Sequence, residues 1–154
     1  MGYWLFKSEP NTFGIDDLAS RPNQTEPWDG VRNYQARNFL RDKVKLNDKV
    51  FIYHSSCKLV GIAGVATVTQ EAYADPTQFN PDSHYYDPKS SVENPRWFCV
   101  DVTFAEKCPH ILPLSVIKTL PGITTLPLVK KGNRLSIMPV ENTEWDVLYQ
   151  AAMS

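Results

Sequence analysis

The chain has 154 residues, of which 42% are hydrophobic and 21% charged, enough for one domain whose core needs no disulfide or metal. Lys and Arg number 16 against 17 Asp and Glu, a formal net charge of −1, so overall charge predicts no partner. No apolar run approaches the length of a membrane span, and no signal peptide is visible, which excludes a membrane protein. The three cysteines fit neither a disulfide framework nor a usual set of zinc ligands, which favours a reducing compartment.

These totals predict a single domain over residues 1–154, monomeric, cytoplasmic (nuclear in a eukaryote) and without metal or other cofactor. The charges are nevertheless unevenly distributed along the chain. Residues 32–49 hold six basic side chains against two acidic ones, and residues 130–134 form a second basic cluster, whereas residues 71–93 are mainly acidic. Segregation of this kind can create a basic face on a neutral protein.

The N-terminal part of the chain begins with a predicted strand over residues 3–7, which are aromatic and strand-prone, followed by a short helix over 15–18. In residues 28–40 (WDGVRNYQARNFL), Asp29-Gly30 predicts a tight turn and Asn33 the N-cap of a helix. Two interpretations of this corner stay open. Trp28, with the helix N-terminus and the arginines beside it, forms a site for a planar ring or an anion; alternatively, Trp28 is a core anchor and the arginines are solvated.

The middle of the chain predicts two strands joined by a short polar hairpin connection. Residues 49–54 place Val50, Ile52 and His54 on one face of the strand and Phe51 and Tyr53 on the other. Residues 60–69 are small or apolar on both faces, with the even-numbered residues 60–68 together on one, as in a central strand packed on both sides.

The remaining segments alternate between irregular and regular structure. Residues 73–95 carry four prolines and no period, but their aromatic residues predict an ordered excursion over one face. Residues 96–105 alternate as a strand, 114–120 suit a short helix, 127–131 a helical turn and 134–138 a last strand. A helix from about residue 143 carries a core-facing stripe. Strands without regular βαβ alternation predict an α+β fold with a bent sheet or partial barrel.

No catalytic motif is present: the chain lacks a phosphate-binding glycine loop, GxSxG and HExxH. His54 and Ser55 are adjacent on a strand and therefore point to opposite faces, which favours a structural histidine over a nucleophile pair. An enzyme that uses His54 as acid or base on a nucleotide or small ligand stays open as an alternative. A protein-interaction module is a third possibility and requires a large exposed apolar patch.

Polar groups at strand ends favour binding over catalysis. Lys7-Ser8, His54-Ser55 and the segment from Arg134 to Ser136 alternate with tryptophan and tyrosine. A base flipped out of a nucleic acid needs a stacking surface and fixed donors and acceptors at its edge. Phosphates on either side of it need Lys and Arg.

Seven motifs along nearly the whole chain carry a resemblance to a known family: YWLFKSEP, WDGVRNYQARNFLRD, FIYHSSCK, GIAGVATV, YYDPKS, ENPRWFCVDV and LVKKGNRLSIMPV. They resemble the EVE domain family. The resemblance implies a PUA-like pseudo-barrel, a mixed curved β-sheet with surrounding helices. It also implies a non-enzymatic reader of modified bases, which takes a modified cytosine of DNA, flipped, into an aromatic-lined pocket; an RNA-binding PUA-like module is the alternative.

Matching the family's motifs position by position gives the expected site. The base is expected to contact Lys7, Ser8, Trp28, Gly30, Val31, Arg32, Asn33, Tyr53, His54 and Ser55. Flanking phosphates are expected at Lys131, Arg134 and Ser136, with Arg32 assisting. No catalytic residue and no metal ligand is expected. Substitution of Trp28 by Ala is expected to abolish binding and to leave the melting temperature nearly unchanged.

Overall fold

The computed structural model describes all residues from 1 to 154, and its centre is a six-stranded sheet in the order β2-β5-β4-β3-β1-β6. The strands are β1 (Tyr3–Ser8), β2 (Thr25–Pro27), β3 (Lys49–His54), β4 (Gly61–Ala74), β5 (Phe98–Pro113) and β6 (Ile137–Pro139). The helices are α1 (Ile15–Ser20), α2 (Tyr34–Asp42), α3 (Leu114–Ile117) and α4 (Asn142–Met153), with 3₁₀ turns η1 (Pro22–Gln24), η2 (Pro76–Phe79) and η3 (Pro127–Val129). The predicted α+β class is confirmed.

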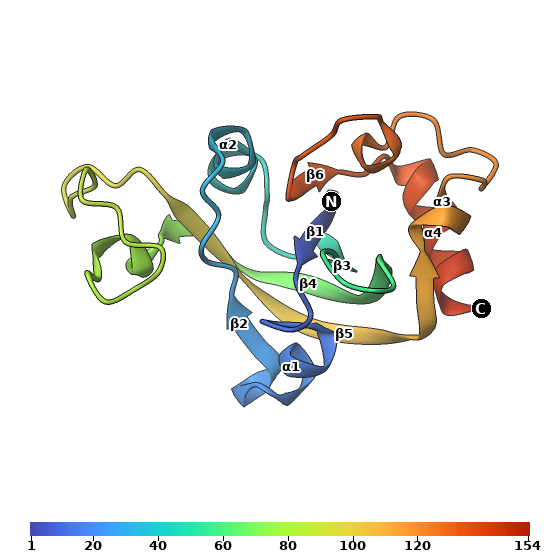
Figure 1. The fold of residues 1–154 in the computed structure, drawn as a ribbon, viewed down its shortest axis with the longest axis horizontal. Coiled ribbons are helices and arrows are strands. Elements are labelled where there is room, and N and C mark those ends of the chain that lie inside the picture. The colour runs from blue at the N-terminus through green and yellow to red at the C-terminus, as the bar shows by residue number, and fades with distance from the viewer.

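The sheet is mixed and does not close into a barrel. Strands β1 and β3 are parallel, and every other pair of neighbours is antiparallel. The edge strands β2 and β6 do not pair with each other, so the sheet bends across the molecule as an open layer (Figure 1). No helix has the length and apolar character that crossing a membrane requires.

Two clusters of buried side chains occupy the two sides of this sheet. One includes residues of α1 and α2, and the other includes residues of α3 and α4. In β3, Val50 and Ile52 belong to the first cluster, and Phe51 and Tyr53 to the second, as the alternation predicts. The stripe on α4 packs into the second cluster through Trp145 and its neighbours, which confirms its core role.

Strand β4 is buried on both faces, as predicted, but its faces are not the predicted ones. Ile62 and Val65 lie in the second cluster, whereas Ala63, Ala66 and Val68 lie in the first. Irregularities of register against β5, between Ile62 and Gly64 and between Val65 and Ala66, break the period of two. Because a bulge inserts one residue, it moves every later side chain to the opposite face.

Several boundaries also differ from the predictions. Strand β5 continues to Pro113 instead of ending near residue 105, because its polar second half pairs through the backbone with Gly61–Val65. Helix α3 ends at Ile117 rather than residue 120, and β6 begins only at Ile137. Strand β2 has only three residues and was not predicted.

Residues 75–97 form the expected ordered excursion, at the end of the molecule opposite α3 and α4 (Figure 1). Two fully buried side chains hold it. Asp75 accepts hydrogen bonds from the backbone N–H of Gly30 and of Thr77, each at 2.8 Å. Gln78 donates to the carbonyl groups of Asp75 and Trp97 and accepts from the Trp97 amide. These contacts fix the excursion against the segment that follows β2.

Candidate nucleic-acid interface

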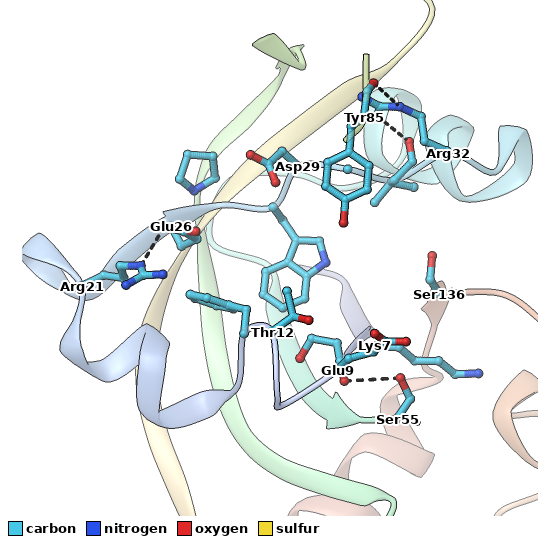
Figure 2. A pocket seen from close by; sticks show the side chains of 16 residues that line it. Lys7, Glu9, Thr12, Arg21, Glu26, Asp29, Arg32, Ser55, Tyr85 and Ser136 are labelled. Atoms are coloured by element: carbon cyan, nitrogen blue, oxygen red, sulfur yellow. Dashed lines mark hydrogen bonds and ion pairs between the residues drawn. The ribbon is translucent and has the colours of Figure 1, made fainter. Parts of the chain in front are cut away.

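A cavity of about 550 Å³ opens where the end of β1 meets the segment after β2 (Figure 2). Its walls come from six parts of the chain: the end of β1 with the loop after it, the region of η1 and β2, the turn after β2, the excursion, the loop before β4 and the loop before β6. The lining residues are Lys7, Ser8, Glu9, Thr12, Phe13, Arg21, Glu26, Pro27, Trp28, Asp29, Gly30, Val31, Arg32, Ser55, Tyr85 and Ser136.

Trp28 satisfies both interpretations left open by the sequence. It belongs to the first core cluster, is only 7% exposed, and lies against Phe6 and Phe13 at ring-centroid distances of 5.6 and 6.0 Å. It also lines the cavity. Its burial contradicts the expectation that Trp28→Ala leaves the melting temperature nearly unchanged, because truncating a buried tryptophan leaves a void in the core.

Polar groups without partners lie beside this indole. The hydroxyl of Ser8 is shielded from solvent and has no hydrogen-bond partner. Lys7 forms no ion pair or hydrogen bond through its ammonium group, which lies 5.9 Å from the centre of the Tyr53 ring, and burial lowers its pKa. Trp4 and Trp97 donate their indole N–H groups to carboxylates, whereas that of Trp28 has no partner within the chain. The Ser8 hydroxyl is costly to bury without a partner, and at the wall of a cavity all three groups can bond a ligand.

Three carboxylates also line the cavity, and one of them, Glu9, lies beside Lys7 and Ser55 (Figure 2). Glu26 pairs with Arg21 at 3.3 Å, on the side of the cavity away from Lys7, Ser55 and Ser136 (Figure 2). Glu9 and Asp29 have no basic partner within ion-pair distance. Burial, with the charges of Asp75 and Glu26, raises the pKa of Asp29 to about 6. The negative charge of Glu9 and Asp29 repels phosphate and suits a ligand with amino donors.

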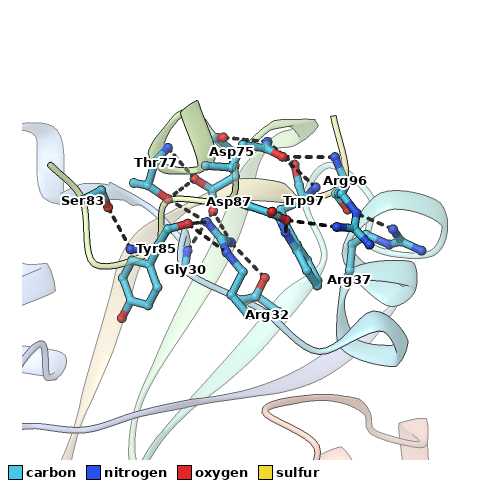
Figure 3. A network of polar contacts seen from close by, with 12 residues as sticks. Gly30, Arg32, Arg37, Asp75, Thr77, Ser83, Tyr85, Asp87, Arg96 and Trp97 are labelled. Carbon is cyan, nitrogen blue, oxygen red and sulfur yellow. Dashed lines mark hydrogen bonds and ion pairs between the residues drawn. The ribbon is translucent and has the colours of Figure 1, made fainter. Parts of the chain in front are cut away.

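The Arg32 guanidinium is fully engaged within the chain. Its five N–H groups donate to the carbonyls of Val31 and Tyr85, the latter twice, to the Asp75 carboxylate at 3.0 Å, and to the Thr77 hydroxyl (Figure 3). The group also lies near the rings of Tyr85 and Trp97, at 5.4 and 5.3 Å. No donor is left for a phosphate. Arg32 instead holds Tyr85 at the cavity wall.

Gly30 makes the close approach of Tyr85 possible. Its φ is +78°, and a β-carbon there would lie 2.7 Å from the Tyr85 ring. The predicted turn therefore depends on glycine both for its backbone conformation and for the space that the ring occupies.

Three residues expected at the base do not line the cavity. Asn33 caps α2, as predicted, by accepting from the Ala36 amide at 2.9 Å. Tyr53 is buried in the second core cluster. His54 accepts a hydrogen bond from the Ile15 amide through Nε2 at 3.1 Å, and burial lowers its pKa. These two hydrogen bonds give Asn33 and His54 structural roles.

The three expected phosphate residues differ in their relation to the cavity. Ser136 lines the cavity, and its carbonyl accepts from the Lys7 amide at 2.9 Å. Lys131 and Arg134 are exposed, do not line the cavity and form no ion pair or hydrogen bond through their side chains. Their phosphate role therefore stays a prediction.

Sequence reasoning missed Tyr85 and the carboxylates of the lining. The cluster of aromatic residues in the excursion was the available signal for Tyr85, but only the contacts of Arg32 and Asp75 bring it to Trp28. The carboxylates gave no signal in the sequence.

The open mixed sheet, its flanking helices and the cavity at the end of β1 define a PUA-like α+β domain with a ligand-sized site, and comparisons with known proteins agree. Residues 2–151 match the EVE domain, and the chain belongs to that family. Human thymocyte nuclear protein 1 is 42% identical over 160 residues, which cover 94% of this chain and 71% of that protein.

Two solved structures share the fold. A crystal structure of a protein from Pseudomonas putida has a TM-score of 0.93 at 47% identity and covers 97% of this chain and 99% of that one. Human THYN1 in complex with DNA that contains 5-methylcytosine has a TM-score of 0.89 at 41% identity and covers 98% of each chain. The PUA-like fold and the family that the sequence motifs indicated are therefore confirmed.

Proposed function

We propose that this protein binds DNA that carries a modified cytosine, with the modified base rotated out of the helix into the cavity beside Trp28. The observation that carries the proposal is the cavity itself, in which an indole N–H, the Ser8 hydroxyl and the Lys7 ammonium group have no partner within the chain. Its volume of about 550 Å³ lies within the usual range of about 300–1,000 Å³ for small-ligand sites.

The chemistry of the lining suits a base better than a phosphate. Trp28 offers an aromatic wall, and such walls hold an unstacked base. The carboxylates Glu9 and Asp29 are acceptors for an exocyclic amino group, which cytosine has and thymine lacks. The same carboxylates repel phosphate, so the backbone of the DNA stays outside the cavity; the exposed side chains of Lys131 and Arg134, which have no partner within the chain, are proposed to contact it.

The complex of human THYN1 with 5-methylcytosine DNA supports the proposal, because that chain has the same fold at 41% identity. The proposed activity is binding without turnover, so DNA is expected to be recovered unchanged. His54 has Nε2 occupied by the Ile15 amide and does not line the cavity, so no observation favours an enzymatic role for it.

The Ser8 hydroxyl provides a sharp test. Ser8→Ala removes a buried, unpartnered hydroxyl and should leave stability unchanged or slightly raised. If the hydroxyl bonds the base, the same change should weaken binding to 5-methylcytosine DNA by about 1 kcal/mol, which is about fivefold in Kd. Fluorescence anisotropy with matched oligonucleotides containing cytosine or 5-methylcytosine, and with RNA of the same sequence, measures both affinity and preference.

Ser90→Ala is the matched control. Its hydroxyl is the other buried side-chain oxygen without a partner, but Ser90 lies outside the cavity, so this variant should bind like wild type. Equal binding of modified and unmodified DNA by the wild-type protein would refute the proposed reader. Loss of affinity in both serine variants alike would refute the placement of the base at Ser8.

A further inference from the structure

We propose that a second hollow beside the cavity, together with the arginine–tyrosine surface next to it (Tyr34, Arg37, Tyr86 and Arg96), holds nucleotides that flank the pocketed base in the same DNA strand. This inference rests on the proposed function and extends the site over the excursion, to residues that lie within the sequence motifs but were not among the expected site residues. It assigns the phosphate contacts on this side to Arg37 and Arg96, since Arg32 has no free donor.

The second hollow adjoins the cavity. It has a volume of about 360 Å³ and is lined by Gly30, Arg32, His84, Tyr85, Tyr86, Asp87 and Trp97. Three of these residues, Gly30, Arg32 and Tyr85, also line the first cavity. The Tyr85 ring and the Arg32 guanidinium that holds it therefore lie between the two hollows. We infer that a DNA strand leaving one hollow can pass over them into the other.

Exposed aromatic rings border this second hollow. Tyr86 is 42% exposed in its lining, and Tyr34, at the start of α2, is 47% exposed. The Tyr34 ring stacks on Trp97 with a centroid distance of 4.9 Å and an interplanar angle of 23°. Exposed rings that are held in place in this way are platforms on which unpaired bases stack with little sequence preference.

The two arginines next to these rings differ in how their positive charge is compensated. Arg37 has no carboxylate within ion-pair distance; it donates to the Arg96 carbonyl at 2.9 Å and to the Asn38 side chain. Its guanidinium lies 4.8 Å from the centre of the Tyr34 ring, and that of Arg96 lies 5.8 Å from the same centre. Arg96 forms an ion pair with Asp87 at 3.5 Å and donates a hydrogen bond to the Tyr34 hydroxyl.

Other arginines of the region contrast with Arg37. Arg32 is paired with Asp75 and Arg41 with Asp42. Burial and the like charges of Arg41 and Arg96 lower the pKa of Arg37, and a bound phosphate would relieve this repulsion. Hydroxyl groups, aromatic faces and the unpaired guanidinium group of Arg37 together suit a nucleic-acid strand, whereas a protein partner would favour a dry apolar patch.

The test compares Arg37→Gln and Tyr86→Ala with Lys118→Gln. Lys118 is an exposed cation without a partner at the end of α3, far from the excursion, so its removal makes the same change in net charge. Anisotropy titrations with modified and unmodified oligonucleotides are repeated over a range of salt concentrations. Arg37→Gln should weaken binding to both DNAs equally and lower the salt slope by about 1. Tyr86→Ala should weaken both by at least about fivefold, and Lys118→Gln should match wild type.

Arg37→Lys keeps the charge and should restore the salt slope, which separates loss of a phosphate contact from loss of fold. Wild-type affinity and salt slope in both Arg37→Gln and Tyr86→Ala would overturn the inference. A different result, in which wild type binds DNA without preferring the modified base, would overturn the proposed function and leave the salt-slope test of Arg37 intact. Equal losses in Arg37→Gln and Lys118→Gln would show a general effect of charge and would also overturn the inference.

Discussion

Replacement of Gly30 by Ala would place a methyl group against the ring of Tyr85, where the turn after β2 and the excursion meet. The added β-carbon would lie 2.7 Å from two ring atoms and 3.0 Å from a third, and the residue would keep a φ of +78°. Two separate costs follow, one from the backbone and one from the ring. They can be measured apart, because only the second requires Tyr85.

The backbone cost for a residue other than glycine in this left-handed region is about 1–2 kcal/mol. The contact with Tyr85 is relieved when the ring swings outward, since this side chain is 37% exposed. That movement gives up its contact with the Arg32 guanidinium, 5.4 Å from the ring centre, which is worth about 0.5–1 kcal/mol. The total destabilisation expected for Gly30→Ala is therefore about 2 kcal/mol.

A double-mutant cycle with Tyr85→Ala separates the two costs. Urea unfolding of the four proteins should show that Gly30→Ala costs about 0.5–1 kcal/mol less when Tyr85 is absent. Binding to 5-methylcytosine DNA should weaken in Gly30→Ala and should not weaken further when Gly30→Ala is added to Tyr85→Ala. An identical cost of Gly30→Ala in both backgrounds would refute the contact between the turn and the ring, and with it the cavity wall described for this site.

Three further changes test the supports of the site. Trp28→Ala should lower the free energy of unfolding by about 3–5 kcal/mol because Trp28 is a core residue, and a urea midpoint close to wild type would contradict its burial. Asp75→Ala should cost about 3 kcal/mol by leaving Arg32 without its carboxylate; Asp75→Asn, which keeps the volume, should cost less in the same assay. Burial lowers the pKa of His54, so the stability that neutral His54 contributes is complete above about pH 6.5 and declines as the pH falls through its lower folded-state pKa. His54→Gln should therefore lose stability relative to wild type at pH 7.5 and less so at pH 5, and a constant difference between the two proteins would contradict the hydrogen bond from the Ile15 amide.

Local patterns in the sequence determined much of the fold. The alternation in β3 and in the first half of β5, the Asn33 cap of α2 and the stripe on α4 each depend on contacts between near neighbours in the chain. Periodicity and capping act over a few residues, so a single sequence carries them fully. The motifs along the chain also indicated the family, which extends over residues 2–151.

Long-range pairing decided the parts of the fold that local patterns missed. The bulges of β4 arise from its register against β5. They place Ile62 and Ala66 on opposite faces of the strand, although the period of two predicts the same face for both. The second half of β5 has no apolar alternation and is a strand only because β4 supplies backbone partners. Strand β2 is too short to carry a pattern of its own, and its three residues are placed by β5.

The sequence, through its resemblance to the EVE domain family, indicated that Trp28, Gly30, Lys7 and Ser8 belong near one site, and all four line the cavity. Only the tertiary structure decided the role of each. Each side chain has a fixed number of hydrogen-bond donors. Four of the five Arg32 donors bond partners more than 40 residues away, and the fifth bonds the neighbouring Val31 carbonyl. The Ser8 hydroxyl, in contrast, has no partner. A donor already used within the chain cannot bind a ligand, and the sequence does not reveal which donors are used.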